Sequence, residues 1–138
     1  MLFGYLYTMK KRVKGVGGVF FKSPDPNALK AWYSKHLHIH SGEHGALFKW
    51  RHEEDPDGPG YTAWNVFPDD TTYFDPSKRD FMFNYIVDNL EELLKVLKKE
   101  GVQLVGEMQE YPYGKFGWIM DPEGNKIELW EPLDENAL

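Results

Sequence analysis

The residue of this sequence best suited to chemistry is Glu128, a carboxylate set between apolar residues in a predicted strand. Alternation along residues 125–130 places Glu128 on the same face as Lys126 and Trp130. An acid in such a strand must either reach solvent or line a site where its charge is needed. Glu128 is therefore a candidate catalytic base, or a carboxylate that recognises a cationic or hydroxylated ligand. The alternative is a structural pair with Lys22 or Lys126.

Polar and aromatic side chains on neighbouring predicted strands are candidates to complete a site around Glu128. Asn84 is the most informative, because a buried amide needs hydrogen-bond partners, and with Lys22 it can form a small polar cluster beside Glu128. An aromatic pocket with a few convergent polar groups is typical of a small-molecule site, although each aromatic residue alone also fits a core. The predicted ligand-binding residues are Phe20, Lys22, Trp64, Phe74, Asn84, Trp118, Glu128 and Trp130.

The histidines offer a second hypothesis, since all of them lie in one region of the chain. His38 and His40 would point to the same side of an extended segment, with His44 nearby, and imidazoles are common metal ligands. The same segment follows a predicted helix end, where solvated histidines are common. Both interpretations stay open.

The composition excludes several classes of partner and site. The net charge of −6 argues against non-specific binding to nucleic acid, which needs a basic face. The chain has no cysteine, which rules out disulfides, thiolate zinc sites and cysteine nucleophiles and fits a reducing cytoplasm. The apolar run at residues 1–9 precedes its basic residues and is too short to span a bilayer, so we expect neither a secretory signal nor a membrane anchor.

Caps and turns define the elements that must position these residues. Asp25 and Asn89 are predicted N-caps of two helices, which end at His38 in a left-handed conformation and at Gly101. Residues 121–124 form a tight turn, in which proline fixes one φ and glycine supplies a positive φ. We expect strands at residues 15–22, 45–51, 61–67, 71–74, 81–87, 102–105, 115–120 and 125–130.

The order of these elements repeats, which predicts an α+β fold of two tandem βαβββ modules forming a cupped mixed sheet. Asp25 matches Asn89, and further along Trp64 matches Trp118. Two such units can face each other and enclose a cleft. The predicted organisation is an accessory segment at residues 1–14, one domain at 15–132 with modules at about 15–75 and 81–132, and a tail at 133–138.

This duplication, closing with the sequence DPEGNKIELWEP, resembles the glyoxalase/bleomycin resistance protein/extradiol dioxygenase group, the vicinal oxygen chelate superfamily. The resemblance implies a pocket in which a divalent metal often chelates substrate oxygens, held by four pseudo-symmetric ligands. The matching positions are Gly18, Phe74, Met82 and Glu128, so Met82 joins the predicted ligand site. Only Glu128 has a ligand-capable side chain. We therefore expect no metal or other cofactor, while a divalent metal held by other residues stays open.

The resemblance implies three alternative functions. The preferred one is binding of a small organic molecule in the cupped-sheet pocket without the family metal, as bleomycin-resistance-type members sequester a ligand without catalysis. The second is a metal-dependent lyase, isomerase or dioxygenase, and the third is a non-catalytic interaction module. Whether the protein is an enzyme stays open. The expected partners are a small-molecule ligand and a second copy of the chain in a homodimer, in the cytoplasm, with neither nucleic acid nor membrane.

Overall fold

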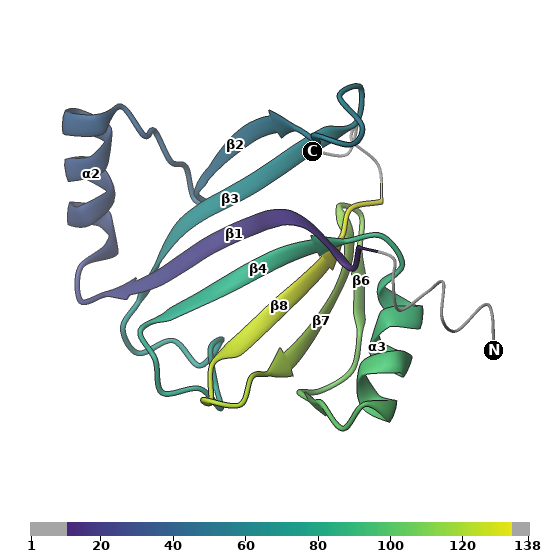
Figure 1. The fold of residues 1–138 in the computed structure, drawn as a ribbon. Coiled ribbons are helices and arrows are strands. Elements are labelled where there is room, and N and C mark those ends of the chain that lie inside the picture. The colour runs from purple at the N-terminus through teal and green to yellow at the C-terminus, as the bar shows by residue number, and fades with distance from the viewer. Residues whose placement is uncertain (1–10, 134–138) are drawn as a thin grey trace.

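The centre of the fold is the antiparallel pair of β1 (Val13–Ser23) and β4 (Phe81–Val87), around which the other strands are arranged (Figure 1). A computed structural model describes residues 11–133, and in that range the chain forms eight strands and two helices. The other elements are α2 (Pro26–Leu37), β2 (Ala46–Arg51), β3 (Pro59–Pro68), α3 (Leu90–Lys99), β5 (Gln103–Leu104), β6 (Gln109–Tyr111), β7 (Gly114–Met120) and β8 (Lys126–Glu131).

The strands form one mixed sheet in the order β2-β3-β1-β4-β8-β7-β5, with β6 paired to β7. On one side of the centre β3 runs parallel to β1, and on the other side β8 runs parallel to β4. The two halves are therefore related by a pseudo-two-fold axis between β1 and β4, which makes β3 equivalent to β8 and β2 equivalent to β7. The sheet curves between the two helices (Figure 1), which confirms the predicted α+β fold with a cupped mixed sheet.

Both helices begin and end where the sequence indicates. The side chains of Asp25 and Asn89 each accept a hydrogen bond from the amide three residues further on, at 3.1 and 3.3 Å respectively. His38 adopts the left-handed conformation at the end of α2, with φ of 56°, and Gly101 follows α3 with φ of 87°. These local signals fix the length of each helix independently of its packing.

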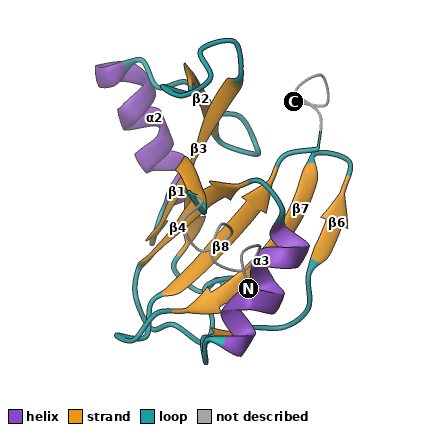
Figure 2. Ribbon diagram, turned by 45° about the vertical axis from the view of Figure 1, so that its right-hand side comes forward, coloured by secondary structure: helices purple, strands orange, loops and turns teal. Residues whose placement is uncertain are grey.

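The two helices differ in what they bury. In α2 none of the residues is buried, and Trp32 and Leu37 are 51% and 56% exposed. Figure 2 shows α3 lying across the sheet near β7 and β8, whereas α2 stands at the opposite end of the molecule. The main apolar core therefore lies under α3, and its buried residues are Val87, Leu90, Leu93, Leu94, Ile119 and Leu129.

The strand expected at residues 71–74 is not formed, which corrects the composition of the first module. Consecutive turns take its place: the amide of Thr71 donates to the Pro68 carbonyl at 3.1 Å, and the amide of Ser77 donates to the Phe74 carbonyl at 2.9 Å. Because the sheet pairs β3 with β1 as it pairs β8 with β4, the counterpart of β8 is β3. The equivalence of Phe74 with Glu128, inferred from sequence spacing, is therefore wrong.

Other differences from the expected elements are small. The first strand begins at Val13, inside the segment expected to be accessory, and β5 is shorter than expected. The remainder of that segment, residues 1–10, and most of the predicted tail, residues 134–138, lie outside the described residues. Within residues 11–133 no helix is both long enough and apolar enough to cross a membrane.

Candidate functional site

The candidate site lies on the inner face of the central strands. The parallel register of β4 and β8 places Asn84 beside Glu128, and the antiparallel register of β7 and β8 places Trp118 opposite Glu128. On the other side of the centre, the register of β1 and β3 places Phe20 beside Asn65. The pseudo-two-fold axis thus relates Asn84 and Glu128 to Phe20 and Asn65, and Asn65 is the structural counterpart of Glu128.

The carboxylate of Glu128 is 3% exposed and is held by three side-chain donors. Asn84 Nδ2 donates to Oε1 at 2.7 Å, Trp118 Nε1 donates to Oε2 at 2.9 Å, and the Tyr73 hydroxyl also donates to Oε2. Hydrogen bonds to a charged acceptor are stronger than those between neutral groups, so these donors offset the cost of burying a carboxylate. The ion pairs found within residues 11–133 do not involve Glu128.

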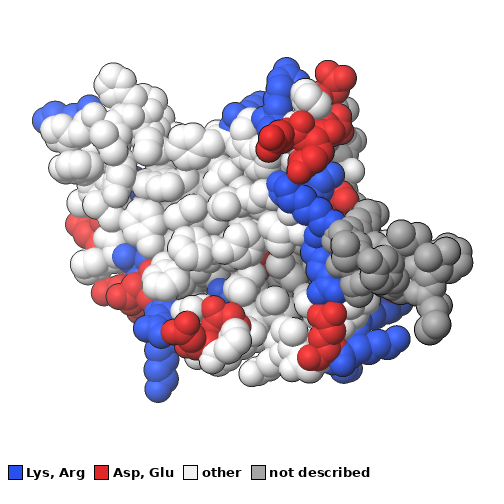
Figure 3. Space-filling model, in the orientation of Figure 1, with Lys and Arg blue, Asp and Glu red and all other residues white. Residues whose placement is uncertain are grey.

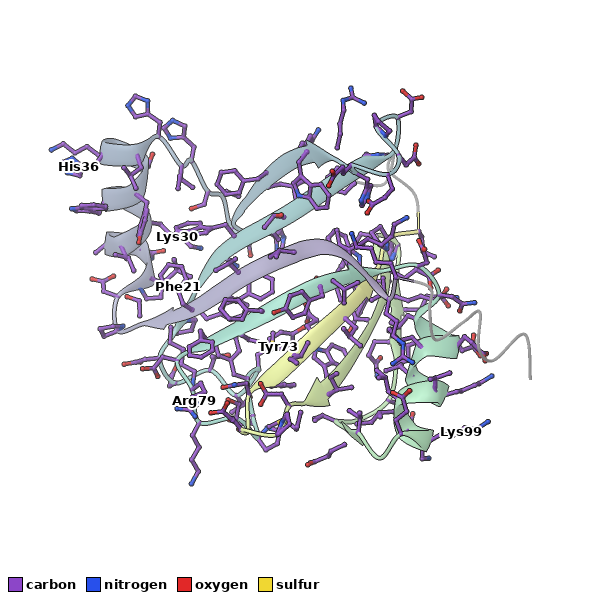
Figure 4. All side chains as sticks on the ribbon, viewed as in Figure 1. Phe21, Lys30, His36, Tyr73, Arg79 and Lys99 are labelled. Carbon is purple, nitrogen blue, oxygen red and sulfur yellow. The ribbon has the colours of Figure 1, made fainter. Side chains whose placement is uncertain are left out.

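Tyr73 reaches Glu128 from the turns that follow β3, and Figure 4 shows it over the middle of the sheet near β8. Its ring stacks on Phe67 with centroids 5.8 Å apart and meets the ring of Trp118 edge-on at 6.4 Å. Although 39% of Tyr73 is exposed, burial and the charge of Glu128 raise the pKa of its hydroxyl. The phenol therefore stays a hydrogen-bond donor at neutral pH.

The two lysines of the inner face do not form the ion pair with Glu128 that was the alternative interpretation of this residue. Lys126 Nζ donates to the backbone carbonyl of Tyr73 at 2.7 Å, and it lies 5.4 Å from the ring centroid of the same residue. Burial lowers the pKa of Lys126, and the charge of Glu128 opposes this effect. Lys22 Nζ lies 5.4 Å from the ring centroid of Phe74. Both ammonium groups are thus directed at the turns after β3.

Glu128 lines a cavity of about 540 Å³ on this face, which is within the usual size of small-molecule sites. The centre of the face seen in Figure 3 is largely uncharged, and charged side chains gather around its edges. Aromatic and amide side chains dominate the wall, and Glu128 is its one acidic member among residues 11–133. The lining residues are Gly17, Phe20, His44, Leu47, Ala63, Asn65, Phe67, Tyr73, Asn84, Tyr113, Phe116, Glu128 and Trp130.

Of the nine residues predicted to bind a ligand, the structure brings four to the cavity wall: Phe20, Asn84, Glu128 and Trp130. Trp118 is absent from that wall but donates to Glu128 from the neighbouring strand β7. The other four residues lie away from the cavity.

Two of those four, Phe74 and Met82, are fully buried, and Lys22 lies over Phe74. Trp64 packs on Phe21 and Tyr33, on the opposite face of the sheet from the neighbouring lining residues of β3.

Sequence reasoning missed several residues of the site, above all Tyr73 and Asn65. Tyr73 was expected in a strand, and nothing in local patterning indicates that a turn carries it 55 positions along the chain to Glu128. Asn65 does carry a signal, since the alternation that places Ala63 and Phe67 inward on β3 places Asn65 there too. An alignment of the two modules that matched β3 to β8 would have identified Asn65 as the counterpart of Glu128.

The family metal does not fit the residues at its positions. With the corrected equivalence these are Gly18, Asn65, Met82 and Glu128, of which glycine and methionine offer no hard ligand. Asn65 Oδ1 accepts a hydrogen bond of 3.0 Å from the next amide in the chain, and three donors already occupy Glu128. Within the described residues, no group of three or more His, Asp or Glu side chains is placed to hold a metal ion.

The histidine hypothesis also lacks a common site. His38 and His40 are exposed and stack with ring centroids 6.0 Å apart, and His40 Nδ1 is 2.5 Å from Ser34 Oγ. His44 lines the cavity that contains Glu128. Within residues 11–133 these three histidines therefore do not come together as a metal-binding group.

Comparison with known proteins gives a family and a fold. The model of the Glyoxalase/Bleomycin resistance protein/Dioxygenase superfamily matches residues 16–129. The structure is similar to methylmalonyl-CoA epimerase from Mycobacterium tuberculosis, with a TM-score of 0.60 at 20% identity, covering 93% of this chain and 94% of that one. It is also similar to a Streptomyces coelicolor methylmalonyl-CoA epimerase variant in complex with 2-nitronate-propionyl-CoA, with a TM-score of 0.64 at 11% identity, covering 88% and 99%.

A third similar structure is described as an NAD-dependent benzaldehyde dehydrogenase from Legionella pneumophila, with a TM-score of 0.53 at 10% identity, covering 84% and 98%. The comparison with curated proteins gives no match. At these identities the solved structures support the fold alone.

Proposed function

The chain belongs to the glyoxalase/bleomycin resistance protein/dioxygenase superfamily, and from that premise we propose that it binds a small organic molecule in the cavity of its cupped sheet. Glu128 is the polar anchor of this site. The observation that carries the proposal is a buried carboxylate with three side-chain donors on the wall of an aromatic cavity. Such an arrangement is typical of a small-molecule site.

The alternative that Glu128 is only structural is less well supported by its surroundings. A buried acid kept for stability is most simply paired with a cation, yet Lys126 and Lys22 are directed at Tyr73 and Phe74. The carboxylate instead depends on neutral donors and keeps its own negative charge at the cavity wall. A buried carboxylate held by neutral donors at a cavity wall is suited to orienting a bound ligand.

We propose that this function does not use the divalent metal of the family. Three donors are directed at the two oxygens of Glu128, and a metal ion would have to displace at least one of them. Gly18 and Met82 offer no replacement ligand. In a catalytic version of the proposal, Glu128 would act as a general base toward a bound substrate, with Tyr73 as the hydrogen-bond donor beside it.

The solved structures of methylmalonyl-CoA epimerases do not extend this proposal to their substrate. A coenzyme A ligand carries phosphate groups, which proteins bind with Lys, Arg or helix N-termini. No Lys or Arg within residues 11–133 lines the cavity. The chemistry of the wall is therefore unsuited to a phosphorylated ligand, and we propose a different ligand class below.

The experiment that tests ligand binding uses tryptophan indole N–H signals in NMR spectra, assigned by single Trp→Phe variants. Trp118 and Trp130 report on the site, because one donates to Glu128 and the other lines the cavity, whereas exposed Trp32 on α2 is an internal reference. A set of chemically diverse small molecules should include compounds that shift the two site signals and leave the Trp32 signal in place.

Binding should then be weakened in Glu128→Gln and retained in Glu123→Gln, which changes an exposed glutamate of the β7–β8 turn. The proposal fails if no compound shifts the site signals, or if Glu128→Gln binds every hit as the wild type does. The spectrum of Glu128→Gln also shows directly whether the variant is folded.

A second proposal, from the exposed apolar side chains of α2 and β2, is that the chain forms a homodimer through this end of the molecule. Trp32 and Leu37 of α2 and Phe48 of β2 are 51%, 56% and 45% exposed. Large apolar side chains exposed on two consecutive elements are candidates for such an interface. Light scattering should give the mass of a dimer, which Leu37→Glu should reduce to that of a monomer and Lys35→Glu should not. A monomeric wild type would contradict the proposal.

A further inference from the structure

One polar atom of the site has no hydrogen-bond partner within residues 11–133, and it is the side-chain oxygen of Asn84. Asn84 is 1% exposed and its Oδ1 is buried without a donor. Its orientation is fixed, because Nδ2 must face the Glu128 carboxylate, to which it donates at 2.7 Å. An unsatisfied buried acceptor costs about 1–3 kcal/mol, so a donor from a bound molecule would remove a real penalty.

The backbone near Asn84 is shaped to accommodate this oxygen. A Cβ atom at Gly17 would lie 2.2 Å from Asn84 Oδ1, so any other residue at position 17 would force the amide to move. Gly17 and Asn84 both line the cavity. The glycine on β1 therefore leaves room for this acceptor, which belongs to a cavity-lining residue hydrogen-bonded to Glu128.

Glu128 also has an acceptor site without a donor, although most of its acceptor sites are occupied. Its two oxygens offer about four lone-pair sites, and Asn84, Trp118 and Tyr73 occupy three of them. The inner-face lysines, Lys22 and Lys126, point toward the turns after β3 and are not among the lining residues. Asn84 and Glu128 thus offer free acceptor sites, and within residues 11–133 Glu128 is the one Asp, Glu, Lys or Arg among the lining residues, which also include the polar side chains of His44 and Asn65.

The aromatic part of the wall also favours a cationic ligand. Aromatic ring faces attract cations through their quadrupoles, by about 0.5–2 kcal/mol for each contact. Phe116 and Trp130 form a stacked pair with centroids 5.8 Å apart and planes inclined by 7°, and a planar group can stack on the outer face of such a pair. The aromatic lining residues are Phe20, Phe67, Tyr73, Tyr113, Phe116 and Trp130.

We infer that the ligand is a planar organic cation with N–H donors, such as an aromatic amidine or guanidine. Its N–H groups bind Asn84 Oδ1 and Glu128, and its ring lies against the aromatic wall. This inference rests on the proposed function and specifies the ligand class. It excludes carboxylates, phosphates and other anions, which would meet acceptors and a negative charge.

Three probes of nearly the same shape test the charge directly: benzamidine, which is a cation at neutral pH, benzamide, which is neutral, and benzoate, which is an anion. Their dissociation constants are measured on the wild-type protein from the indole signals of Trp118 and Trp130, with Trp32 as reference. We expect benzamidine to bind at least about tenfold more tightly than benzamide. Benzoate should bind more weakly than both.

Substitution of Glu128 then separates the effect of ligand charge from the effect of ligand shape. In Glu128→Gln the preference for benzamidine over benzamide should fall to less than about threefold, since the charge is lost and the cavity keeps its size. Glu123→Gln removes the same charge from an exposed turn and should keep the wild-type preference. The probe series on the wild type remains decisive even where Glu128→Gln does not fold.

The possible failures are distinguishable. Binding of benzamide or benzoate as tight as that of benzamidine overturns the ligand class and leaves the proposed small-molecule function intact. The same holds if none of the three probes binds while other compounds of the diverse set shift the site signals. If neither the probes nor the set affects Trp118 and Trp130, both this inference and the proposed function are wrong.

Discussion

The hydroxyl of Tyr73 donates a hydrogen bond to the carboxylate of Glu128, across 55 positions of the sequence. The two residues are far apart in the duplicated chain, because the turns that carry Tyr73 connect β3 of the first half to β4 of the second. This connection between the halves therefore supplies a donor to the site. A regular strand at residues 71–74 would be committed to the sheet and would not reach the inner face of β8.

Replacing Tyr73 with phenylalanine tests the worth of this contact. The variant keeps the ring stacked on Phe67 and removes one of three donors from a buried carboxylate. A hydrogen bond to a charged group contributes about 1.5–3 kcal/mol, so we expect the free energy of unfolding at neutral pH to fall by about that amount. Urea unfolding measures it. Tyr111→Phe, at an exposed tyrosine, should change stability by less than about 0.5 kcal/mol, and equal effects of both changes would contradict the prediction.

The pH dependence of stability should carry a signature of the same hydroxyl. Burial, followed by the charge of Glu128, raises the pKa of Tyr73 in the folded protein. The resulting stabilisation is complete below the unfolded-state pKa of about 10 and is lost as the pH rises toward the folded-state value. Above about pH 10 the wild type should therefore lose stability relative to Tyr73→Phe, by at most about 1.4 kcal/mol per pH unit.

Solvent around the ring reduces that slope, since 39% of Tyr73 is exposed. Urea unfolding of both proteins from about pH 8 to 11 provides the comparison. Parallel stability curves would show that the hydroxyl has the same pKa in the folded and unfolded states.

Much of the fold is predictable because its signals are local. Asp25, Asn89 and His38 act within one turn of their own helix, and all three are found in the predicted roles. The turn at residues 121–124 and the alternation along β8 likewise depend on neighbours in sequence. Glu128 could be identified as a site candidate for the same reason, since an acid within an apolar strand is conspicuous without knowledge of its partners.

The composition of the site is less predictable because it depends on pairing between distant strands. Counting along the repeat matched Phe74 to Glu128, whereas the sheet pairs Asn65 with Phe20 as it pairs Glu128 with Asn84. Insertions in loops change the number of residues between equivalent positions of the two halves, but they do not change the register of the paired strands. Spacing in the sequence alone therefore misassigns equivalent positions. Tyr73 is harder still, because a turn has no periodicity that would indicate the direction of its side chains.

The end of α2 gives a prediction that is independent of the site. His38 has φ of 56°, and in this left-handed conformation a side chain with a Cβ is strained by about 1–2 kcal/mol. His38→Gly should therefore raise the free energy of unfolding by about 0.5–1 kcal/mol. His36→Gly, inside the helix, should lower it by about 0.5 kcal/mol. Thermal unfolding measures both, and a loss of stability in His38→Gly would show that its ring makes a contact worth more than the strain.

Lys126 should control how firmly Tyr73 is held over the cavity. Its ammonium group donates to the Tyr73 carbonyl at 2.7 Å, so Lys126→Met keeps most of the buried stem and releases the turns after β3. The amides of Asp75 and Ser77 bond to carbonyls within those turns and report on their opening by hydrogen exchange. Loss of a contact worth about 1.5 kcal/mol should speed their exchange roughly tenfold.

The matched control is Lys95→Met, at an exposed position on α3, which should leave both amides unchanged. Unchanged exchange in Lys126→Met would mean that the turns are held by their own hydrogen bonds and by the Tyr73 hydroxyl. In that case the double variant Lys126→Met/Tyr73→Phe should open them, because it removes both side-chain contacts that join residue 73 to β8. If the double variant also exchanges slowly, the aromatic stack of Tyr73 on Phe67 is sufficient to hold the turns in place.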